Sequence, residues 1–297
     1  MSDKKMPAVI ALGYFDSVHL GHRKIIEAAA EYARKNGAEP VIVTFNGNLK
    51  AALHGQEIRS VYTTEERKGI YASLGVNEVV FEPIDKEFLS LSKNEFLDRI
   101  NARYGVLAYF CGQDYRFGIN GSGSAESVQE YAAAHGQKCF VCKLLENGGE
   151  KISTTLIKQL LFDGQLERAN ELLCRKYSIS GVVFKDREVG KKLGFPTVNI
   201  KLESEKQRLK DGVYAGSVAI ENKRHKAIIN YGARPTFDLK EKLVEAHIVD
   251  FEGNLYGEKL TLYFHDYLRD IIKFSSEEQL IEQLKNDLQK VKGMDYD

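Results

Sequence analysis

The sequence predicts an α/β protein with two domains, a doubly wound parallel-sheet domain over residues 1–176 and an antiparallel β-barrel domain over 177–297 that ends in a helix. Apolar strands and amphipathic helices alternate through the first half, a pattern typical of a parallel sheet covered on both faces. In the second half, strand-like runs follow one another without helices between them, which favours an antiparallel barrel. A chain of 297 residues is long enough for each half to bury its own core.

The expected strands of the first half are short apolar runs separated by helices with recognisable ends. Capping boxes, in which a hydroxyl and a glutamate satisfy the N–H groups of a helix start, occur at Thr63-x-x-Glu66 and Ser92-x-x-Glu95. Gly37 is expected to end the first helix. The strands are expected at 8–12, 41–45, 79–81, 105–111 and 139–145.

The expected barrel begins where this alternation stops, after Arg175-Lys176-Tyr177. A last helix is expected to be capped by Ser275-x-x-Glu278. Its apolar face is formed by Leu280, Ile281, Leu284, Leu288 and Val291. The barrel strands are expected at 179–184, 198–200, 213–220, 226–231, 243–251 and 259–268.

Charge balance and apolar content exclude several classes of protein. Lys plus Arg and Asp plus Glu both number 42, so the formal net charge is zero, which argues against a nucleic-acid partner bound through bulk positive charge. No apolar run approaches the ~20 residues that a membrane helix needs, and residues 1–7 contain no secretory hydrophobic region. With four cysteines that suit a reducing compartment, these features predict a cytoplasmic protein without a membrane partner and leave its oligomeric state open.

Two histidines, His19 and His22, flank Gly21 where an expected strand turns into a helix. A helix start offers unpaired backbone N–H groups and a partial positive charge, which suit a phosphate, and glycine lets the backbone approach that phosphate closely. The pattern therefore indicates phosphoryl or nucleotidyl transfer, in which fixed donors meet the charge that grows on phosphate oxygens. From the residues alone, a surface or structural pair of histidines stays open as the alternative.

Two further segments of the first half allow a similar choice. The loop 112–123 follows another strand, is rich in glycine, and carries Arg116, which could pair with a phosphate; the alternative is a flexible surface loop. Ser153 and Thr154 place hydroxyls at a helix start, with Lys158 one turn further on. This arrangement suits ATP phosphates, and it suits ordinary helix capping at least as well.

The segment 190–199, Gly-Lys-Lys-Leu-Gly-Phe-Pro-Thr-Val-Asn, is the sharpest feature of the second half. Thr197 and Asn199 are two residues apart, so on a strand they share one face. A hydroxyl and an amide oxygen are hard ligands that suit Mg²⁺ held together with ATP phosphates. Judged by spacing alone, a hairpin turn with two solvated polar side chains is slightly favoured.

The motifs of the first half resemble those of a known family. Gly-Tyr-Phe-Asp-Ser-Val-His-Leu-Gly-His at 13–22 is similar to the signature of the nucleotidylyltransferase superfamily, and most similar to the adenylyltransferase half of the bacterial bifunctional riboflavin kinase/FAD synthetases. Segments 112–118 and 152–158 also resemble motifs of this family. The resemblance implies catalytic roles for His19 and His22. It implies ATP binding by Gly13, Phe15, Gly21, Ser153, Thr154 and Lys158, and flavin or nucleotide contacts by Asp114, Arg116 and Phe117.

The second half resembles the riboflavin kinase half of the same family. The resemblance is carried by Gly-Phe-Pro-Thr-x-Asn at 194–199, Asn-x-Gly-x-Arg-Pro-Thr-Phe at 230–237 and the strand around Glu245. It implies that Glu245, otherwise an ordinary solvated glutamate, accepts the proton of the riboflavin hydroxyl that attacks the γ-phosphate of ATP. It also implies Mg²⁺ binding by Thr197 and Asn199, ATP binding by Lys191, Gly194 and Pro196, and flavin binding by Arg234 and Arg269.

The resemblance covers nearly the whole chain and implies that riboflavin is converted to FMN and FMN to FAD, each step using ATP and Mg²⁺. The chain departs from the family pattern at four places. Ser17 replaces a glycine, Lys158 replaces an arginine, Asn-Gly-Asn at 46–48 replaces a Pro-His-Pro turn, and Lys-Asp-Arg at 185–187 replaces a His-Gly-Asp stretch. Two alternatives follow: a chain that retains only one activity, the kinase foremost, or a flavin-binding regulator without turnover.

Overall fold

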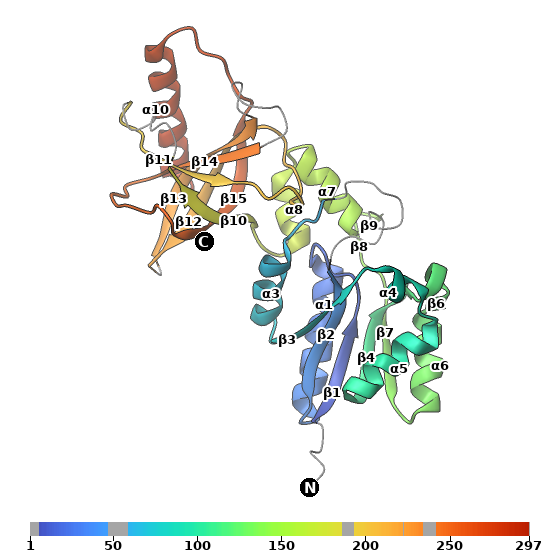
Figure 1. Cartoon of the computed structure of the whole chain (residues 1–297). Helices are drawn as coiled ribbons and strands as arrows, with labels where there is room; N and C mark the ends of the chain where they lie inside the picture. Colours follow the sequence, from blue (N-terminus) through green and yellow to red (C-terminus); the bar gives the residue numbers. More distant parts are fainter. Residues whose placement is uncertain (1–5, 47–58, 186–192, 222, 234–241, 297) are drawn as a thin grey trace. The chain divides into compact units, whose positions relative to one another are not determined.

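The structure is a computed structural model that describes residues 6–46, 59–185, 193–221, 223–233 and 242–296. It divides into two compact units, Met1–Ile157 and Lys158–Asp297. The first unit contains a sheet with helices, and the second contains a barrel and a long last helix (Figure 1). Among the described residues, no helix is both long and apolar enough to cross a membrane.

A parallel sheet of five strands forms the centre of the first unit. The strands are β1 (Pro7–Leu12), β2 (Glu39–Asn46), β3 (Glu78–Pro83), β4 (Gly105–Gly112) and β7 (Lys138–Cys142). Their order across the sheet is β3-β2-β1-β4-β7, so the direction of winding reverses between β1 and β4. Ile10 of β1 pairs with Val41 of β2 on one side and with Tyr109 of β4 on the other. The predicted doubly wound parallel sheet is confirmed.

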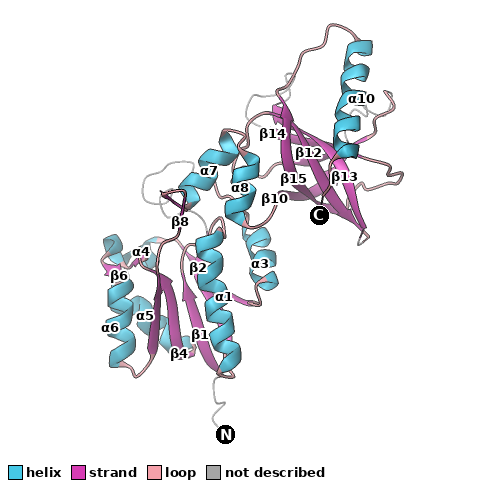
Figure 2. Ribbon diagram, turned by 180° about the vertical axis from the view of Figure 1, so that it is seen from behind, coloured by secondary structure: helices cyan, strands magenta, loops and turns pink. Residues whose placement is uncertain are grey.

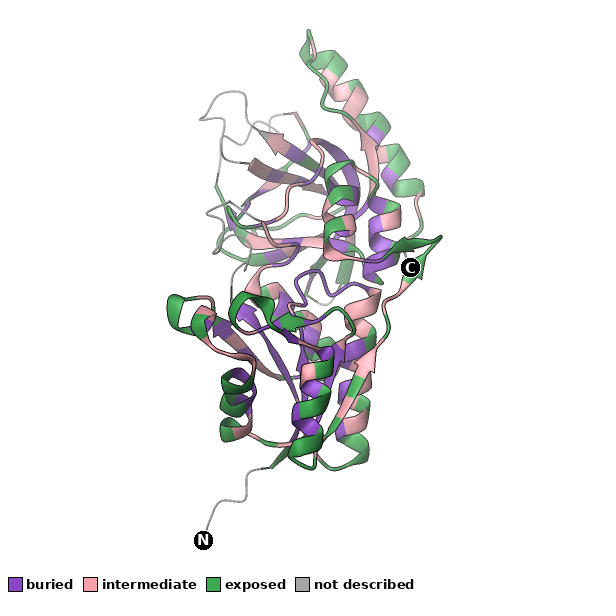
Figure 3. Ribbon diagram, turned by 90° about the vertical axis from the view of Figure 1, so that its right-hand side faces the viewer, coloured by how far each residue is buried: buried purple, intermediate pink, exposed green. Residues whose placement is uncertain are grey.

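Helices cover both faces of this sheet (Figure 2). They are α1 (Leu20–Lys35), α3 (Thr64–Ser73), α4 (Lys86–Ser90), α5 (Lys93–Arg103) and α6 (Ala125–Ala134). Val9 and Ala11 of β1 share an apolar core with α1 and α3, whereas Ile10 and Leu12 share the opposite core with α5 and α6. Figure 3 shows the resulting burial along the strands. Both predicted capping boxes are present, at the starts of α3 and α5.

Several short elements follow β4 along the chain of the first unit. They are β5 (Arg116–Phe117), the 3-10 helix η1 (Ile119–Gly121), β6 (Gly123–Ser124), β8 (Glu146–Asn147) and β9 (Glu150–Lys151). Helix α7 (Thr154–Phe162) crosses the boundary between the two units. The loops that follow β1 and β4 both leave the carboxyl edge of the sheet, so their residues meet at one place.

A closed antiparallel barrel forms the centre of the second unit, as predicted. Its strands are β10 (Tyr177–Phe184), β11 (Thr197–Lys201), β12 (Gly212–Ile220), β13 (Lys223–Ala233), β14 (Lys242–Ile248) and β15 (Lys259–Arg269). Around the barrel the order is β10-β11-β14-β13-β12-β15. Helix α8 (Leu166–Leu173) is tied to it by Asn170, whose Nδ2 donates to Phe264 O (3.0 Å) and whose Oδ1 accepts from Tyr177 N (2.6 Å).

Several predicted element ends in this unit differ from the structure: β10, β11 and β13 are longer than predicted, and two other differences have a clear physical reason. Strand β14 ends at Ile248 instead of 251, because Asp250 has a φ of 53°, a left-handed conformation that extended chain does not adopt. The last helix, α10 (Glu277–Gly293), is capped by Ser276 instead of Ser275, since the Ser276 hydroxyl accepts from Gln279 N. Ser275 donates to the Gln279 side chain instead (2.8 Å).

Candidate functional site

The first cluster of predicted residues lies at the carboxyl edge of the parallel sheet, where the winding reverses between β1 and β4. Ligands of doubly wound sheets bind at this crevice. The loop after β1 contributes His19 to it and the loop after β4 contributes Asp114. Both residues line a cavity of about 190 Å³, together with the start of α1 and with residues between Cys142 and Thr154. Its lining includes His19, Gly21, His22, Gly112, Asp114, Lys151, Ser153 and Thr154.

The rings of His19 and His22 are stacked at the start of α1, with their centroids 3.7 Å apart. His19 Nδ1 accepts a hydrogen bond from His22 N (3.3 Å), so a neutral His19 carries its proton on Nε2. A Cβ atom on Gly21 would lie 3.1 Å from His19 Cε1, closer than ordinary contact. Glycine at this position therefore leaves room for the His19 ring, and Nε2–H remains as a donor toward an anion.

Burial keeps both histidines uncharged at neutral pH. It lowers the pKa of His19 from its ordinary value to about 4. Burial also lowers the pKa of His22 well below its ordinary value, and the neighbouring His19 lowers it further. His22 Nδ1 is buried and makes no hydrogen bond within the described part of the chain. Stacked neutral rings avoid the repulsion of two imidazolium charges and can still donate to a phosphate oxygen.

Two contacts near this cavity were not predicted. Ser17 Oγ lies 3.0 Å from Thr154 Oγ1, so the serine that departs from the family pattern links the loop after β1 to the start of α7. Lys151 Nζ forms an ion pair with Asp114 Oδ2 at 2.7 Å, and each side chain is about half exposed. The sequence signal for Lys151 was its place directly before the hydroxyl-rich segment that begins with Ile152 and Ser153.

Five other predicted residues do not line this cavity. Gly13 and Phe15 are buried in the turn after β1, where Phe15 has a φ of 43°. Arg116 is exposed on β5, and the Phe117 ring packs in the apolar core. Lys158 is half-buried on α7 and is the first residue of the second unit. Their functional roles stay predictions.

The second cluster lies on three neighbouring strands of the barrel, β11, β14 and β13. Asn199 lies opposite Glu245, Glu245 lies opposite Asn230, and Thr197 lies opposite His247. Thr197 Oγ1 donates a hydrogen bond to Glu245 Oε1 (2.7 Å). The ladder of the closed barrel thus fixes a carboxylate beside a hydroxyl and an amide.

Thr197 lies in the walls of two different cavities. One has a volume of about 440 Å³, and the other has a volume of about 300 Å³ and also contains Glu245 in its wall. A molecule in either cavity would therefore meet the same side chain. Thr197 is thus a side chain that ligands in both cavities can contact.

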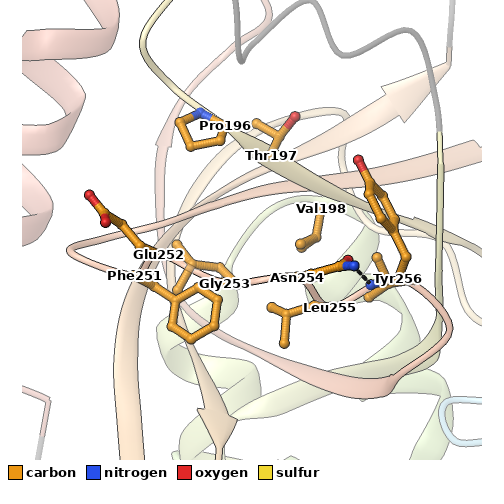
Figure 4. Close-up of a pocket in the computed structure, with 11 residues that line it drawn as sticks. Pro196, Thr197, Val198, Phe251, Glu252, Gly253, Asn254, Leu255 and Tyr256 are labelled. Carbon is orange, nitrogen blue, oxygen red and sulfur yellow. Dashed lines mark hydrogen bonds between the residues drawn. The ribbon is translucent and has the colours of Figure 1, made fainter.

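The larger cavity is formed by Val183, by Pro196–Val198 on the start of β11 and by the connection between β14 and β15 (Figure 4). In that connection, residues 251–256, Asn254 Oδ1 accepts a hydrogen bond from Tyr256 N (3.1 Å). Tyr256 lines this cavity and is 44% exposed. Tyr256-Gly257 also follows the family pattern, but sequence reasoning assigned no role to this segment; its turn residues, Glu252-Gly253-Asn254, were the available signal.

The smaller cavity is mainly apolar, with a few polar groups. Its apolar lining consists of Leu193, Phe195, Val213, Ile228, Ile271, Ile272, Phe274, Leu280 and Leu284. Its polar lining consists of Thr197, Asn230, Glu245, His247 and Arg269. Ile271 and Ile272 are 47% and 44% exposed, an arrangement that suits a large apolar ligand with a polar end. Sequence reasoning missed His247, although it follows Glu245 by two residues and so shares its face of the strand.

The remaining predicted residues of the second half are only partly placed. Gly194, with a φ of 82°, and Pro196 are exposed in the turn before β11. Arg269 reaches the smaller cavity. Lys191 and Arg234 lie outside the described residues, as do 47–48 and 186–187 from the departures noted above.

The oxygen atoms predicted to hold Mg²⁺ fit a hard cation. Asn199 Oδ1 is buried and has no hydrogen-bond partner among the residues that the structure describes, and a buried carbonyl oxygen is costly unless a donor or cation meets it. Thr197 directs its hydroxyl proton to Glu245, which leaves oxygen lone pairs for a cation. No group of three or more His, Cys, Asp or Glu side chains suited to a metal occurs in the described segments. A cation here would therefore share its coordination with ligand phosphates.

Comparison with known proteins matches both halves of the chain. The FAD synthetase family model matches residues 1–156, and the riboflavin kinase family model matches 173–294. Two relatives are named bifunctional riboflavin kinase/FMN adenylyltransferase. The protein from Listeria monocytogenes is 31% identical over 95% of this chain and 90% of its own length. The protein from Bacillus subtilis is 29% identical over 97% of this chain and 93% of its own length. A solved structure described as a macrolide-efflux protein from Streptococcus pneumoniae is 31% identical, with a TM-score of 0.89 over 98% of this chain and 95% of its own. The family models confirm the resemblance that the motifs indicated.

Proposed function

Because this chain belongs to the bifunctional riboflavin kinase/FMN adenylyltransferase family, we propose that it phosphorylates riboflavin to FMN in the barrel and adenylylates FMN to FAD at the carboxyl edge of the parallel sheet. ATP is the second substrate of both steps. The single observation that carries the kinase assignment is the hydrogen bond between Thr197 and Glu245 in the wall shared by two cavities. Phosphoryl transfer needs two substrates held in line on either side of one transferring group.

In this proposal the smaller, apolar cavity binds riboflavin and the larger cavity binds ATP. The flat isoalloxazine ring suits the apolar lining that includes Ile271 and Phe274, and the ribityl chain suits the polar end with Glu245. The adenine and ribose suit the segment 251–256. The γ-phosphate then lies near Thr197, which belongs to both walls.

Glu245 is the general base of the proposed kinase reaction. Its carboxylate accepts the proton of the terminal ribityl hydroxyl while that oxygen forms a bond to the γ-phosphorus and the bond to ADP breaks. The hydrogen bond from Thr197 orients the carboxylate. Mg²⁺ held by Thr197 and Asn199 would neutralise charge on the phosphates of ATP.

The adenylyltransferase reaction proceeds at the cavity that holds the stacked histidines. FMN attacks the α-phosphorus of ATP and pyrophosphate leaves. His19 donates from Nε2 to an oxygen of the transferring phosphate, and the first backbone N–H groups of α1, which have no carbonyl partner within the helix, add further donors. Lys151, whose ion pair with Asp114 is solvent-exposed, supplies a cation that can turn to a phosphate of ATP.

One incubation tests the proposed function. The full-length protein is mixed with riboflavin, ATP and Mg²⁺, and riboflavin, FMN and FAD are separated by chromatography over time. We expect FMN to appear first and FAD to follow. FMN without FAD would indicate a chain that retains only the kinase, and flavin binding without ATP consumption would indicate a regulator. We propose a cytoplasmic location as well, where both substrates are available and four unpaired cysteines remain reduced.

We also propose that the two activities reside in separable domains. The sequence predicts a boundary after residue 176, whereas the compact units meet after Ile157. A fragment that starts at Lys158 is expected to fold and to form FMN. A fragment that starts at Tyr177 loses α8 and the buried hydrogen bonds of the Asn170 side chain to Phe264, His265 and Tyr177, so its free energy of unfolding should be lower by at least about 2 kcal/mol. Denaturant unfolding of both fragments measures this difference; equal stabilities would contradict it.

His247 is expected to position the turn that separates the two cavities. Its Nδ1 lies 2.9 Å from Pro196 O, and its ring meets the Phe195 ring edge to face at 5.3 Å. Because a carbonyl only accepts, Nδ1 is the donor. In His247→Asn the amide N–H can replace Nδ1–H, whereas in His247→Gln it stands at the place of Nε2. We therefore expect His247→Gln to raise the KM for riboflavin more than His247→Asn, by about threefold or more. Identical KM values in steady-state kinetics would contradict this role.

A further inference from the structure

A buried carboxylate holds the arginine of the smaller barrel cavity. Asp287 of α10 is fully buried. Its Oδ2 accepts from Arg269 Nε (3.0 Å) and Nη2 (2.7 Å), and its Oδ1 accepts from the same Nε (3.2 Å) and from Gln283 Nε2 (2.9 Å). Arg269 Nη1 donates to Asp270 O (3.1 Å). These bonds engage all three nitrogens of the guanidinium and so fix both its position and its plane. Two of its five N–H groups make no bond to the residues that the structure describes.

Helix α10 forms one wall of the same cavity. Leu280 and Leu284 line it together with Arg269, and Asp287 follows Leu284 by three residues, so the three helical residues lie on one side of α10. Only Asp287 and Val291 of this helix are buried. Val291 belongs to an apolar cluster with barrel residues and holds the last turns of α10. Leu280 and Leu284, which line the cavity, precede both Asp287 and Val291 along the helix. Of the two buried residues, Asp287 is therefore nearer in sequence to the cavity wall.

The chemistry of this contact favours positioning over stability. Moving a carboxylate and a guanidinium out of water costs several kcal/mol, and apolar residues of similar size often stabilise a fold as well or better. Bidentate pairing of Arg269, in contrast, gives a geometry that apolar residues cannot supply. The charged pair therefore makes physical sense where the direction of the guanidinium matters, which is at the cavity that Arg269 lines.

We infer that Asp287 is a positioning residue of the kinase half: through Arg269 it sets the direction of the guanidinium, and through α10 it sets the helical wall of the flavin cavity. It does so without lining the cavity itself. The inference rests on the proposed function, since that proposal assigns riboflavin to this cavity. It extends the riboflavin site to a residue of α10 that does not itself line the cavity.

Asp287→Asn tests this role with little change of shape. The amide keeps one acceptor oxygen but loses the charge and presents N–H groups to the N–H groups of Arg269. We expect the KM for riboflavin to rise at least about tenfold, with the KM for ATP within about twofold of the parent value. FAD formation from added FMN should match the parent rate. A general loss of structure would change the KM for riboflavin, the KM for ATP and the rate of FAD formation. A misdirected Arg269 should change only the KM for riboflavin.

Two further variants complete the experiment. Lys292→Met is the matched control: it breaks the exposed ion pair between Lys292 of the same helix and Asp250 (2.8 Å), and it should leave both KM values unchanged. Gln283→Met removes one hydrogen bond to Asp287 without leaving a buried charge unpaired. It should raise the KM for riboflavin by about two- to fivefold, and it decides the question if circular dichroism shows Asp287→Asn to be unfolded.

The outcomes separate this inference from the function on which it rests. A parent protein that forms no FMN would overturn the proposed kinase function and the inference with it. An active parent, with Asp287→Asn folded and its riboflavin KM unchanged, would overturn only the role of Asp287. Equal rises in the KM values for riboflavin and ATP would also overturn it, because they would identify a purely structural contact.

Discussion

Replacing Glu245 with glutamine is expected to lower the rate of FMN formation by about 10²–10⁴-fold, the usual contribution of a general base. The amide has the size of the carboxylate and can still accept the hydrogen bond from Thr197. It cannot take up the proton of the ribityl hydroxyl at neutral pH. Binding of riboflavin and ATP should change little, because proton transfer belongs to the transition state.

Two initial rates on the same purified Glu245→Gln protein measure this effect. FMN formation from riboflavin should fall, and FAD formation from added FMN should equal that of the parent, because the second reaction is assigned to the other unit. Asn230→Asp is unsuitable as a control because Asn230 lines the same cavity; the exposed Glu221→Gln on the turn after β12 is suitable. Near-parent FMN formation by Glu245→Gln would remove this glutamate from the mechanism.

His19→Ala and His22→Ala are each expected to slow FAD formation by about 10²–10³-fold, the usual effect of removing one preorganised donor from a developing oxyanion. FMN should then accumulate, because the barrel is unaltered. The tautomer adds a sharper expectation. Since His19 Nδ1 accepts from the backbone, the proton of the neutral ring is on Nε2. His19→Gln, whose amide can stand at Nε2, should therefore retain more activity than His19→Asn.

The pH dependence provides a second measurement of the same site. Burial lowers the pKa of His19 to about 4, so the ring is already neutral at neutral pH. Lowering the pH from about 8 to about 6 should therefore not change FAD formation through this histidine, whereas an ordinary histidine would titrate in that interval. An activity limb near pH 6.5 that is absent from His19→Gln would contradict the neutral-donor role, as would parent-like FAD formation by both alanine variants.

The architecture was predictable because its signals are local and periodic. Strands such as 8–12 and 41–45 are apolar runs bounded by turn residues, and the capping boxes at Thr63 and Ser92 depend only on residues three apart. The shift of the last cap from Ser275 to Ser276 shows the limit of such signals. Two adjacent serines fit the same capping pattern. In the structure, the Ser276 hydroxyl accepts from Gln279 N, and the Ser275 hydroxyl donates to the Gln279 side chain.

The candidate sites were only partly predictable, because lining residues meet through tertiary contacts. Spacing alone placed Thr197 and Asn199 on one face of a strand, and the ladder adds Glu245 to them. Nothing in the helical periodicity indicates that Asp287 is buried, since a charged residue in a polar helix is ordinarily solvated. Phe117 shows the converse: it lies in a family motif, yet its side chain packs in the apolar core.

In the proposed kinase site, the groups assigned to the chemistry lie on strands of the closed barrel, whereas part of the cavity lining lies on connections between elements. Thr197, Asn199 and Glu245 lie on adjoining strands whose spacing is fixed by backbone hydrogen bonds. Strand residues also line the cavities, but residues 251–256 of the larger cavity and Ile271, Ile272 and Phe274 of the smaller one belong to connections between elements. Connections tolerate substitution better than strands do. Homologous chains could therefore acquire preferences for other nucleotides or altered flavins through these connections while the distance between base and phosphate-binding groups stays constant.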